Sequence, residues 1–129
     1  MLELALFAPW VFLLFIGALD TGVYAYCLVS MQAAARSAVL YTSSSSTLAS
    51  NSDAACNVVL GEMRSVPGLG AATSCDSNPY VRAASVTGPD SAAASQVTIR
   101  LTSPALIPLP GLLAKQFTIT RTAKMRIRT

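Results

Sequence analysis

The hydrophobic and polar positions divide the chain into a leading apolar segment and a mixed remainder. Residues 4–19 contain no charged side chain, and residues 20–42 continue in helix-compatible residues, with Gly22 as the weak helix former. Beyond residue 24, polar positions such as Arg36 alternate with apolar ones at helical spacing. We therefore predict one long helix over residues 1–42, apolar in its first half and amphipathic in its second.

Residues 43–129 predict a small α+β head. A short helix is expected over residues 53–66, with Ser52 or Asp53 as its cap and a Pro-Gly pair at its end. The hydroxyl-rich run at residues 42–47 predicts an exposed loop, because its side chains compete for backbone hydrogen bonds. The buried face of the short helix should hold four apolar side chains at helical spacing: Ala55, Val59, Met63 and Val66.

Alternating apolar and polar residues predict three strands in the rest of the head. They cover residues 80–87, 96–103 and 117–128, and the sequence Gly-Pro-Asp at residues 88–90 predicts the turn between the first two. We expect a roughly three-stranded, mostly antiparallel sheet laid on the second half of the long helix. The side chains expected to face inward are Val97, Ile99, Leu101, Phe117, Ile119, Ala123, Met125 and Ile127.

The segment PALIPLPGLLAK, between the last two strands, combines three prolines with apolar side chains. The prolines forbid a regular element. An exposed loop of this composition would form an apolar patch that binds other surfaces. It either folds back over the head or docks on a neighbouring subunit.

Composition and charge indicate a weakly charged surface. Charged residues make up 12% of the chain, below the usual share of about a quarter. The net charge is +3, and five of the nine basic residues lie in the last fifteen positions. They form either a solvated strand face or a contact with an acidic patch on a neighbour or an anionic surface. Since no recognition motif accompanies these residues (Lys115, Arg121, Lys124, Arg126 and Arg128), no nucleic-acid partner is expected.

The sequence offers no set of residues for catalysis. It contains no histidine, which is the commonest general base and metal ligand. Its serines lack a convincing base, and its cysteines are isolated rather than paired as C-x-x-C. We expect neither an enzyme nor a protein that holds a metal or another cofactor.

The cysteines suggest a disulfide instead. Cys56 and Cys75 are expected outside the membrane, where disulfides persist. A bridge would join the short helix to the start of the sheet and stabilise the head by about 3 kcal/mol through loop closure. The alternative is two buried free thiols. Cys27 is expected to be a small apolar residue of the long helix.

The long helix has two features that a simple anchor does not need. Pro9 should kink it or loosen one turn. Small residues recur at four-residue intervals, which allows helix backbones to approach closely, unless they reflect only an Ala- and Gly-rich composition. One line of small residues comprises Gly17, Thr21 and Ala25, and the next comprises Ala18 and Gly22.

Two acidic residues lie in this helix. Asp20 costs little at a membrane surface, but needs a partner if subunits bury it. Glu3 lies near the helix N-terminus, where the helix dipole favours its charge. Alternatively, Glu3 pairs with the N-terminal amine of an adjacent subunit and sets the register of an assembly.

The apolar segment reaches the length of a membrane span when it is counted across Asp20. Because it lacks a basic stretch and a cleavage site, it does not resemble a cleavable secretory signal. Either a basic leader has been removed from this chain, or its true start lies upstream. Both alternatives place the N-terminus in the cytoplasm and the head outside.

The first 42 residues resemble the N-terminal signature of TadE-like pilins, the minor-pilin class of tight-adherence pili in the type IV pilus superfamily. The similarity lies in an acid among apolar residues, a proline, a Gly…Asp-x-Gly step, an aromatic residue and an Ala-Ala-Ala-Arg stretch. The residues that carry it are Glu3, Pro9, Gly17, Asp20, Gly22, Tyr24 and Arg36.

The resemblance implies a structural subunit of a bacterial cell-surface filament that serves adhesion. It implies an inner-membrane precursor whose leader is cut by a prepilin peptidase, and pilus machinery that assembles the subunits through their N-terminal helices. Glu3 would match the family's acid near the mature N-terminus. The alternative is a minor pilin or a membrane-anchored component that organises a pilus or secretion machine without forming the bulk filament.

Overall fold

The computed structural model describes residues 2–104 and 116–128, apart from the side chains of residues 2–5 and 104. A long apolar helix, a short helix and a three-stranded antiparallel sheet follow one another, as predicted. The elements in chain order are α1 (Leu2–Thr42), a 3-10 turn (Leu48–Ser50), α2 (Ser52–Glu62), β1 (Tyr80–Thr87), β2 (Ala93–Pro104) and β3 (Gln116–Arg126).

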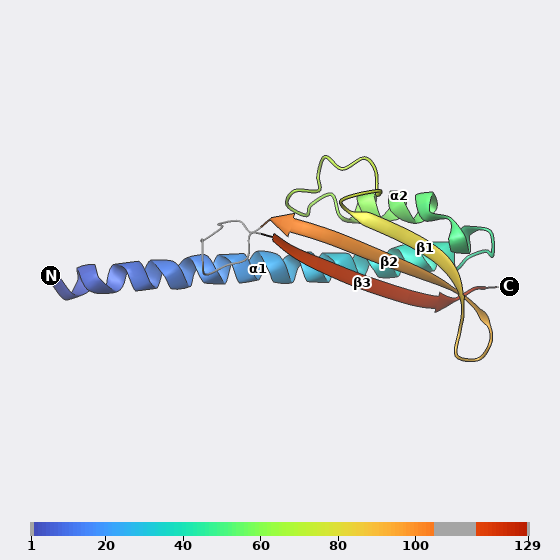
Figure 1. The fold of residues 1–129 in the computed structure, drawn as a ribbon, viewed down its shortest axis with the longest axis horizontal. Helices are drawn as coiled ribbons and strands as arrows, with labels where there is room; N and C mark the ends of the chain where they lie inside the picture. Colours follow the sequence, from blue (N-terminus) through green and yellow to red (C-terminus); the bar gives the residue numbers. More distant parts are fainter. Residues whose placement is uncertain (1, 105–115, 129) are drawn as a thin grey trace.

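Helix α1 is the axis of the molecule (Figure 1). At 1.5 Å per residue, its 41 residues are about 60 Å long. The sheet and α2 lie along its second half, while its first half projects beyond them. The helix continues through Pro9 to Thr42, so the predicted extent of this element is confirmed.

The sheet has the order β1-β2-β3, with both neighbouring pairs antiparallel. The predicted bounds of β1 are confirmed, whereas β2 begins earlier than predicted, at Ala93. The turn between them closes through the Gly88 amide, which donates to the Ala92 carbonyl at 2.7 Å. A longer β2 can therefore pair with β1 along its whole length, from Tyr80 opposite Arg100 to Thr87 opposite Ala93.

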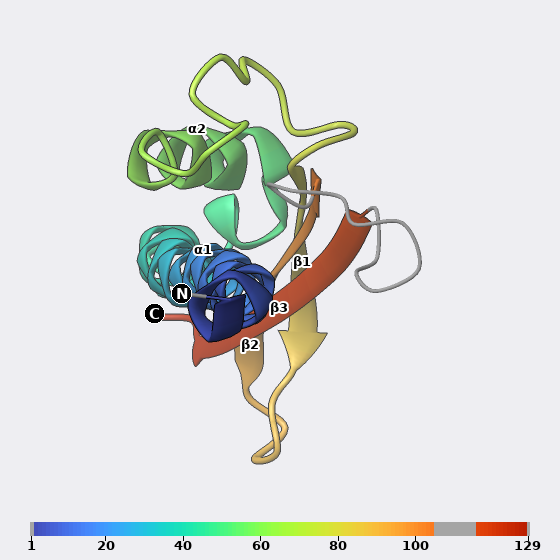
Figure 2. The same cartoon turned by 90° about the vertical axis from the view of Figure 1, so that its left-hand side faces the viewer.

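The core lies between the inner face of the sheet, α2 and the second half of α1, as the end view shows (Figure 2). Most side chains predicted to face inward are buried, and Phe117, Ala123 and Met125 are half-buried against the core. The α1 residues in this core recur every three or four positions along one face: Cys27, Met31, Ala34, Ala35, Ala38 and Val39.

Helix α2 is shorter than predicted, because it ends at Glu62 rather than at residue 66. The chain then continues in turns, in which the Val66 amide donates to the Met63 carbonyl at 3.0 Å. Since these turns still direct both side chains into the core, Met63 and Val66 are buried as predicted.

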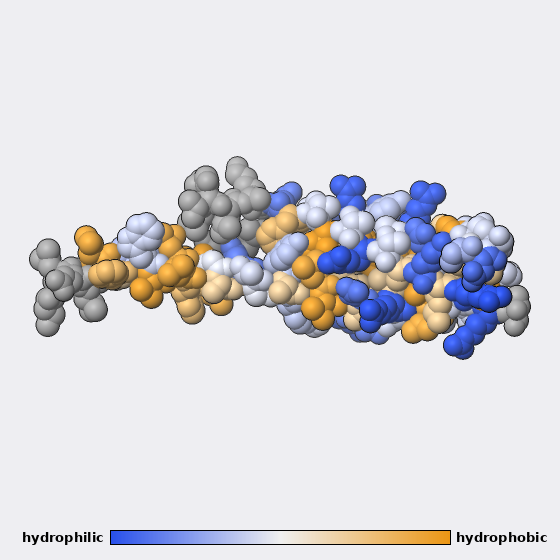
Figure 3. Space-filling view, turned by 90° about the horizontal axis from the view of Figure 1, so that it is seen from below, coloured by the Kyte–Doolittle hydropathy of each residue, from blue (hydrophilic) through white to orange (hydrophobic). Residues whose placement is uncertain are grey.

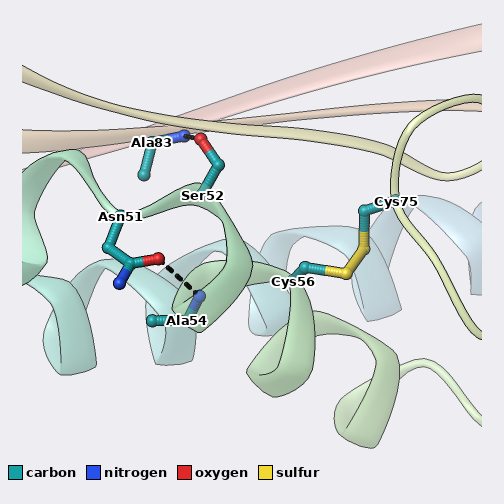
Figure 4. Close-up of a disulfide and its surroundings, with 6 residues drawn as sticks. All are labelled: Asn51, Ser52, Ala54, Cys56, Cys75 and Ala83. Atoms are coloured by element: carbon teal, nitrogen blue, oxygen red, sulfur yellow. Dashed lines mark hydrogen bonds between the residues drawn. A yellow bond between two sulfur atoms is a disulfide. The ribbon is translucent and has the colours of Figure 1, made fainter.

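The predicted helix cap was wrong by one residue. Asn51 caps α2, because its side-chain oxygen accepts a hydrogen bond from the Ala54 amide at 3.0 Å (Figure 4). The Ser52 hydroxyl instead accepts from the Ala83 amide on the outer edge of β1, at 3.1 Å. Ser52 therefore joins α2 to the sheet, while Asn51 satisfies the helix end.

The expectation of an exposed loop at residues 42–47 is wrong for its first two residues. Thr42 and Ser43 are buried. The Thr42 and Ser95 hydroxyls lie 2.7 Å apart, and the Ser95 hydroxyl donates to the Ala49 carbonyl at 3.2 Å. The Ser43 carbonyl accepts from the Arg128 amide at 2.9 Å. These residues are buried because β2 and the end of the chain supply hydrogen-bond partners.

The disulfide between Cys56 and Cys75 is confirmed (Figure 4). It joins α2 to the segment that leads into β1, where the Val81 amide donates to the Cys75 carbonyl at 3.1 Å. Cys27 is free and buried, as expected of a small apolar core residue.

Candidate functional site

The half of α1 that projects beyond the head is called the rod below. Between residues 6 and 15, it exposes large apolar side chains on all sides. Leu6 and Leu14 are about three-quarters exposed, at 73% and 74%. Hydrophobic residues dominate the surface of this rod, whereas hydrophilic ones gather on the head (Figure 3). Other side chains in the rod that are more than half exposed are Phe7, Trp10, Val11, Phe12 and Phe15.

Among the described residues, α1 packs against the core of the head from Val23 onward. The Tyr24 ring meets the Phe117 ring edge-to-face, with centroids 5.3 Å apart. Two residues later, the Tyr26 hydroxyl lies 2.9 Å from the Ser65 hydroxyl. Because 3.6 residues make one turn, the head can cover only one face of the helix here, and Val29 remains 70% exposed.

The predicted small-residue lines lie at the surface of the part of the chain that the structure describes. Ala18, Thr21, Gly22 and Ala25 are exposed, and Gly17 is half-exposed. A Cβ atom added at Gly17 or Gly22 would meet no atom of the described residues within 4 Å. The Thr21 hydroxyl donates to the Gly17 carbonyl at 2.7 Å, so it is satisfied within the helix. This surface could therefore accept another helix backbone at close range.

The structure places the two predicted acids differently. Asp20 is 8% exposed, and among the described residues its Oδ2 atom has no hydrogen-bond partner. A buried carboxylate oxygen without a partner is unfavourable. Asp20 is buried here within a single chain, so its burial by neighbouring subunits stays a prediction. The Glu3 side chain, the apolar proline-rich loop at 105–115 and Lys115 lie outside the described residues.

Among the described residues, no group of three or more His, Cys, Asp or Glu side chains is placed to hold a metal ion.

One arrangement was missed by sequence reasoning. Arg36 of α1 and Arg121 of β3 line the same groove. No local signal could have paired them, because their common place in the groove depends on how the sheet lies on the helix.

Helix α1 is long and apolar enough to cross a membrane, by length and composition. It could therefore be a membrane anchor or a signal sequence, and both are compatible with its position at the start of the chain. No protein-family model, curated protein or solved structure matches this chain.

Proposed function

We propose that this protein is a pilin-like structural subunit, which assembles through its N-terminal helix into a bacterial cell-surface filament. Before assembly, the same helix would anchor the protein in the inner membrane with the head outside. The resemblance of the first 42 residues to the signature of TadE-like pilins supports this proposal. The role in adhesion rests on that resemblance alone.

The observation that carries the proposal is the exposed apolar rod joined without a break to the core of the head. Burying one large apolar side chain contributes about 1.5–3 kcal/mol. A rod with at least seven such side chains exposed therefore requires lipid or other protein around it. A rigid connection to the head would transmit the packing of the rods to the spacing of the heads.

Sister chains explain the rod better than lipid alone. Lipid-facing helices gain little from small residues, whereas packed helices use them to bring backbones together. Gly17, Thr21 and Gly22 lie on the uncovered surface of α1, close to the level at which the head begins. The small residues are thus available where a neighbouring rod would first meet this one.

The proposal is tested by shearing surface material from cells that produce the chain and examining it by negative-stain microscopy. Mass spectrometry should identify this chain in regular fibres and give its N-terminus. Recovery of the chain only from the inner-membrane fraction would contradict the filament and favour an anchored component of a pilus or secretion machine.

A further inference from the structure

A basic groove runs along one side of the head between α1 and β3. We define the basic groove by Arg36 on the helix wall and by Arg121 and Lys124 on the strand wall. Its volume is about 600 Å³. All three side chains are exposed, and no acidic residue among those that the structure describes lines the groove. It therefore concentrates positive charge on one edge of the molecule.

The two arginines of the basic groove are not neutralised within the described part of the chain, where no ion pair occurs. Lys124 differs, because its ammonium group donates to the Thr87 carbonyl at 2.9 Å. Arg121 lies opposite Ile99 in the register, in the row of β3 whose other members pack toward the core. Arg121 is the member of this row that is open to solvent, because it lines the groove. Its guanidinium group can therefore reach a ligand.

The acidic counterpart lies on the other side of the head. Asp53, in the first turn of α2, and Asp76 line one shallow groove beside the Cys56–Cys75 disulfide. Both are exposed. Figure 2 shows that α2 and β3 flank α1 from different sides. We call Asp53 and Asp76 the acidic pair.

We propose that the basic groove of one subunit binds the acidic pair of the next subunit. This inference rests on the proposed filament and specifies how its heads would contact one another. Since the two surfaces differ and lie on different sides of the head, the contact is heterologous. A heterologous contact repeats from copy to copy and produces an open helical array unless a ring closes.

Charge complementarity is the reason to choose a second copy as the occupant. Within the described part of the chain, no basic residue lines the groove of the acidic pair, and no acidic residue lines the basic groove. A single exposed ion pair contributes about 0–1 kcal/mol, so the contact would orient heads rather than drive assembly. The apolar rods would supply most of the association energy.

The test is a charge-reversal cycle in cells that produce the full-length chain. The variants are Arg36→Glu with Arg121→Glu, Asp53→Lys with Asp76→Lys, and all four changes together. Each double variant places like charges across the contact, and we expect about a tenfold lower yield of sheared fibres, as a change of 1.4 kcal/mol would give. The fourfold variant should recover most of the yield, because the charges are complementary again.

The matched control is Arg82→Glu with Arg100→Glu, which changes the net charge by the same amount on exposed positions of β1 and β2. It should leave the fibre yield unchanged. Equal loss in this control, or no recovery in the fourfold variant, would overturn the inference. Binding of the unaltered chain to vesicles with anionic phospholipid, lost with Arg36→Glu and Arg121→Glu while fibres persist, would also overturn it and assign the groove to lipid.

The inference and the filament proposal can fail separately. Fibres that withstand both reversals contradict the inference alone. If the unaltered chain forms no fibres, the filament proposal fails, and self-association of the full chain in detergent decides the inference. In that measurement, raising the salt concentration from about 0.05 to 0.5 M should weaken association, since the Debye length shortens to a few ångströms. Salt-independent association would contradict it.

Discussion

At the scale of single residues, the buried hydroxyl pair Thr42–Ser95 fixes the end of α1 to the sheet. Each hydroxyl can donate one hydrogen bond. The Ser95 hydroxyl donates to the Ala49 carbonyl. The Thr42 hydroxyl can donate to the Ser95 hydroxyl, 2.7 Å away, or to the Val39 carbonyl of its own helix, 3.3 Å away. This chain of bonds connects α1, the 3-10 turn and β2 in an otherwise apolar region.

We expect Ser95→Ala to destabilise the protein by about 1–3 kcal/mol, because it leaves the buried Ala49 carbonyl without this donor. Thermal unfolding of the full chain in detergent, followed by circular dichroism, measures the change. Thr98→Val is the matched control, since it removes one member of the exposed Thr98–Thr122 hydroxyl pair. An equal effect of the two substitutions would show that burial does not set the strength of the Thr42–Ser95 pair.

At the scale of elements, the disulfide holds α2 against the segment that enters β1. Its half-cystines are 19 residues apart, a loop whose closure contributes about 3 kcal/mol by chain entropy. Replacing both Cys56 and Cys75 by alanine should lower the free energy of unfolding by that amount. A reductant should lower the melting temperature of the unaltered chain and leave that of the double variant unchanged. Sensitivity of the variant to the reductant would contradict this explanation.

Substitution of the glycines of α1 can distinguish a role in folding from a role in assembly. Gly17 and Gly22 have open space where a side chain would be, and glycine is a weaker helix former than leucine. Gly17→Leu with Gly22→Leu should therefore preserve or raise the stability of the isolated chain. The same change should reduce fibre yield by about tenfold or more, because helix backbones can no longer approach closely.

Gly61 in α2 provides the control for these glycines, since it too has open space at its Cβ position. Gly61→Leu should leave the fibre yield unaltered. Normal fibres from the Gly17→Leu, Gly22→Leu variant would show that the small residues of α1 do not form a helix contact.

At the scale of the whole molecule, one helix has two roles in different parts of its length. Residues from Cys27 to Val39 supply one wall of the core, whereas the projecting rod contributes little to the head. The exposed apolar surface of the rod is larger than a soluble monomer usually tolerates. The head and the rod should therefore respond very differently to truncation.

A chain that starts at Thr21 should remain folded and be soluble without detergent, because it retains the core residues of α1 and loses most of the exposed apolar surface. A chain that starts at Ser43 should not fold, since Met31, Ala34 and Ala38 are gone from the core. Circular dichroism and size-exclusion chromatography distinguish the two. If the chain that starts at Ser43 were folded and monomeric, the assignment of α1 to the core would be contradicted.

The sequence by itself determined which elements form, but not the end of α2 or the start of β2. The extent of α1, the three strands and their inward-facing rows follow from local periodicity and from helix- and strand-breaking residues, which need no distant partner. It also identified Cys56 and Cys75 as a pair. The resemblance to a pilin signature, and with it the filament, stays a prediction, as does the role of Glu3.

Only the tertiary structure decided which polar residues are buried and which surfaces meet. Asn51, Ser52 and Asp53 are all plausible caps, and the Ala83 amide of β1 engages Ser52 and leaves Asn51 as the cap. Thr42 is buried because Ser95 comes to it from β2. Arg36 and Arg121 share a groove for the same physical reason: contacts between residues distant in sequence depend on how the sheet lies on α1.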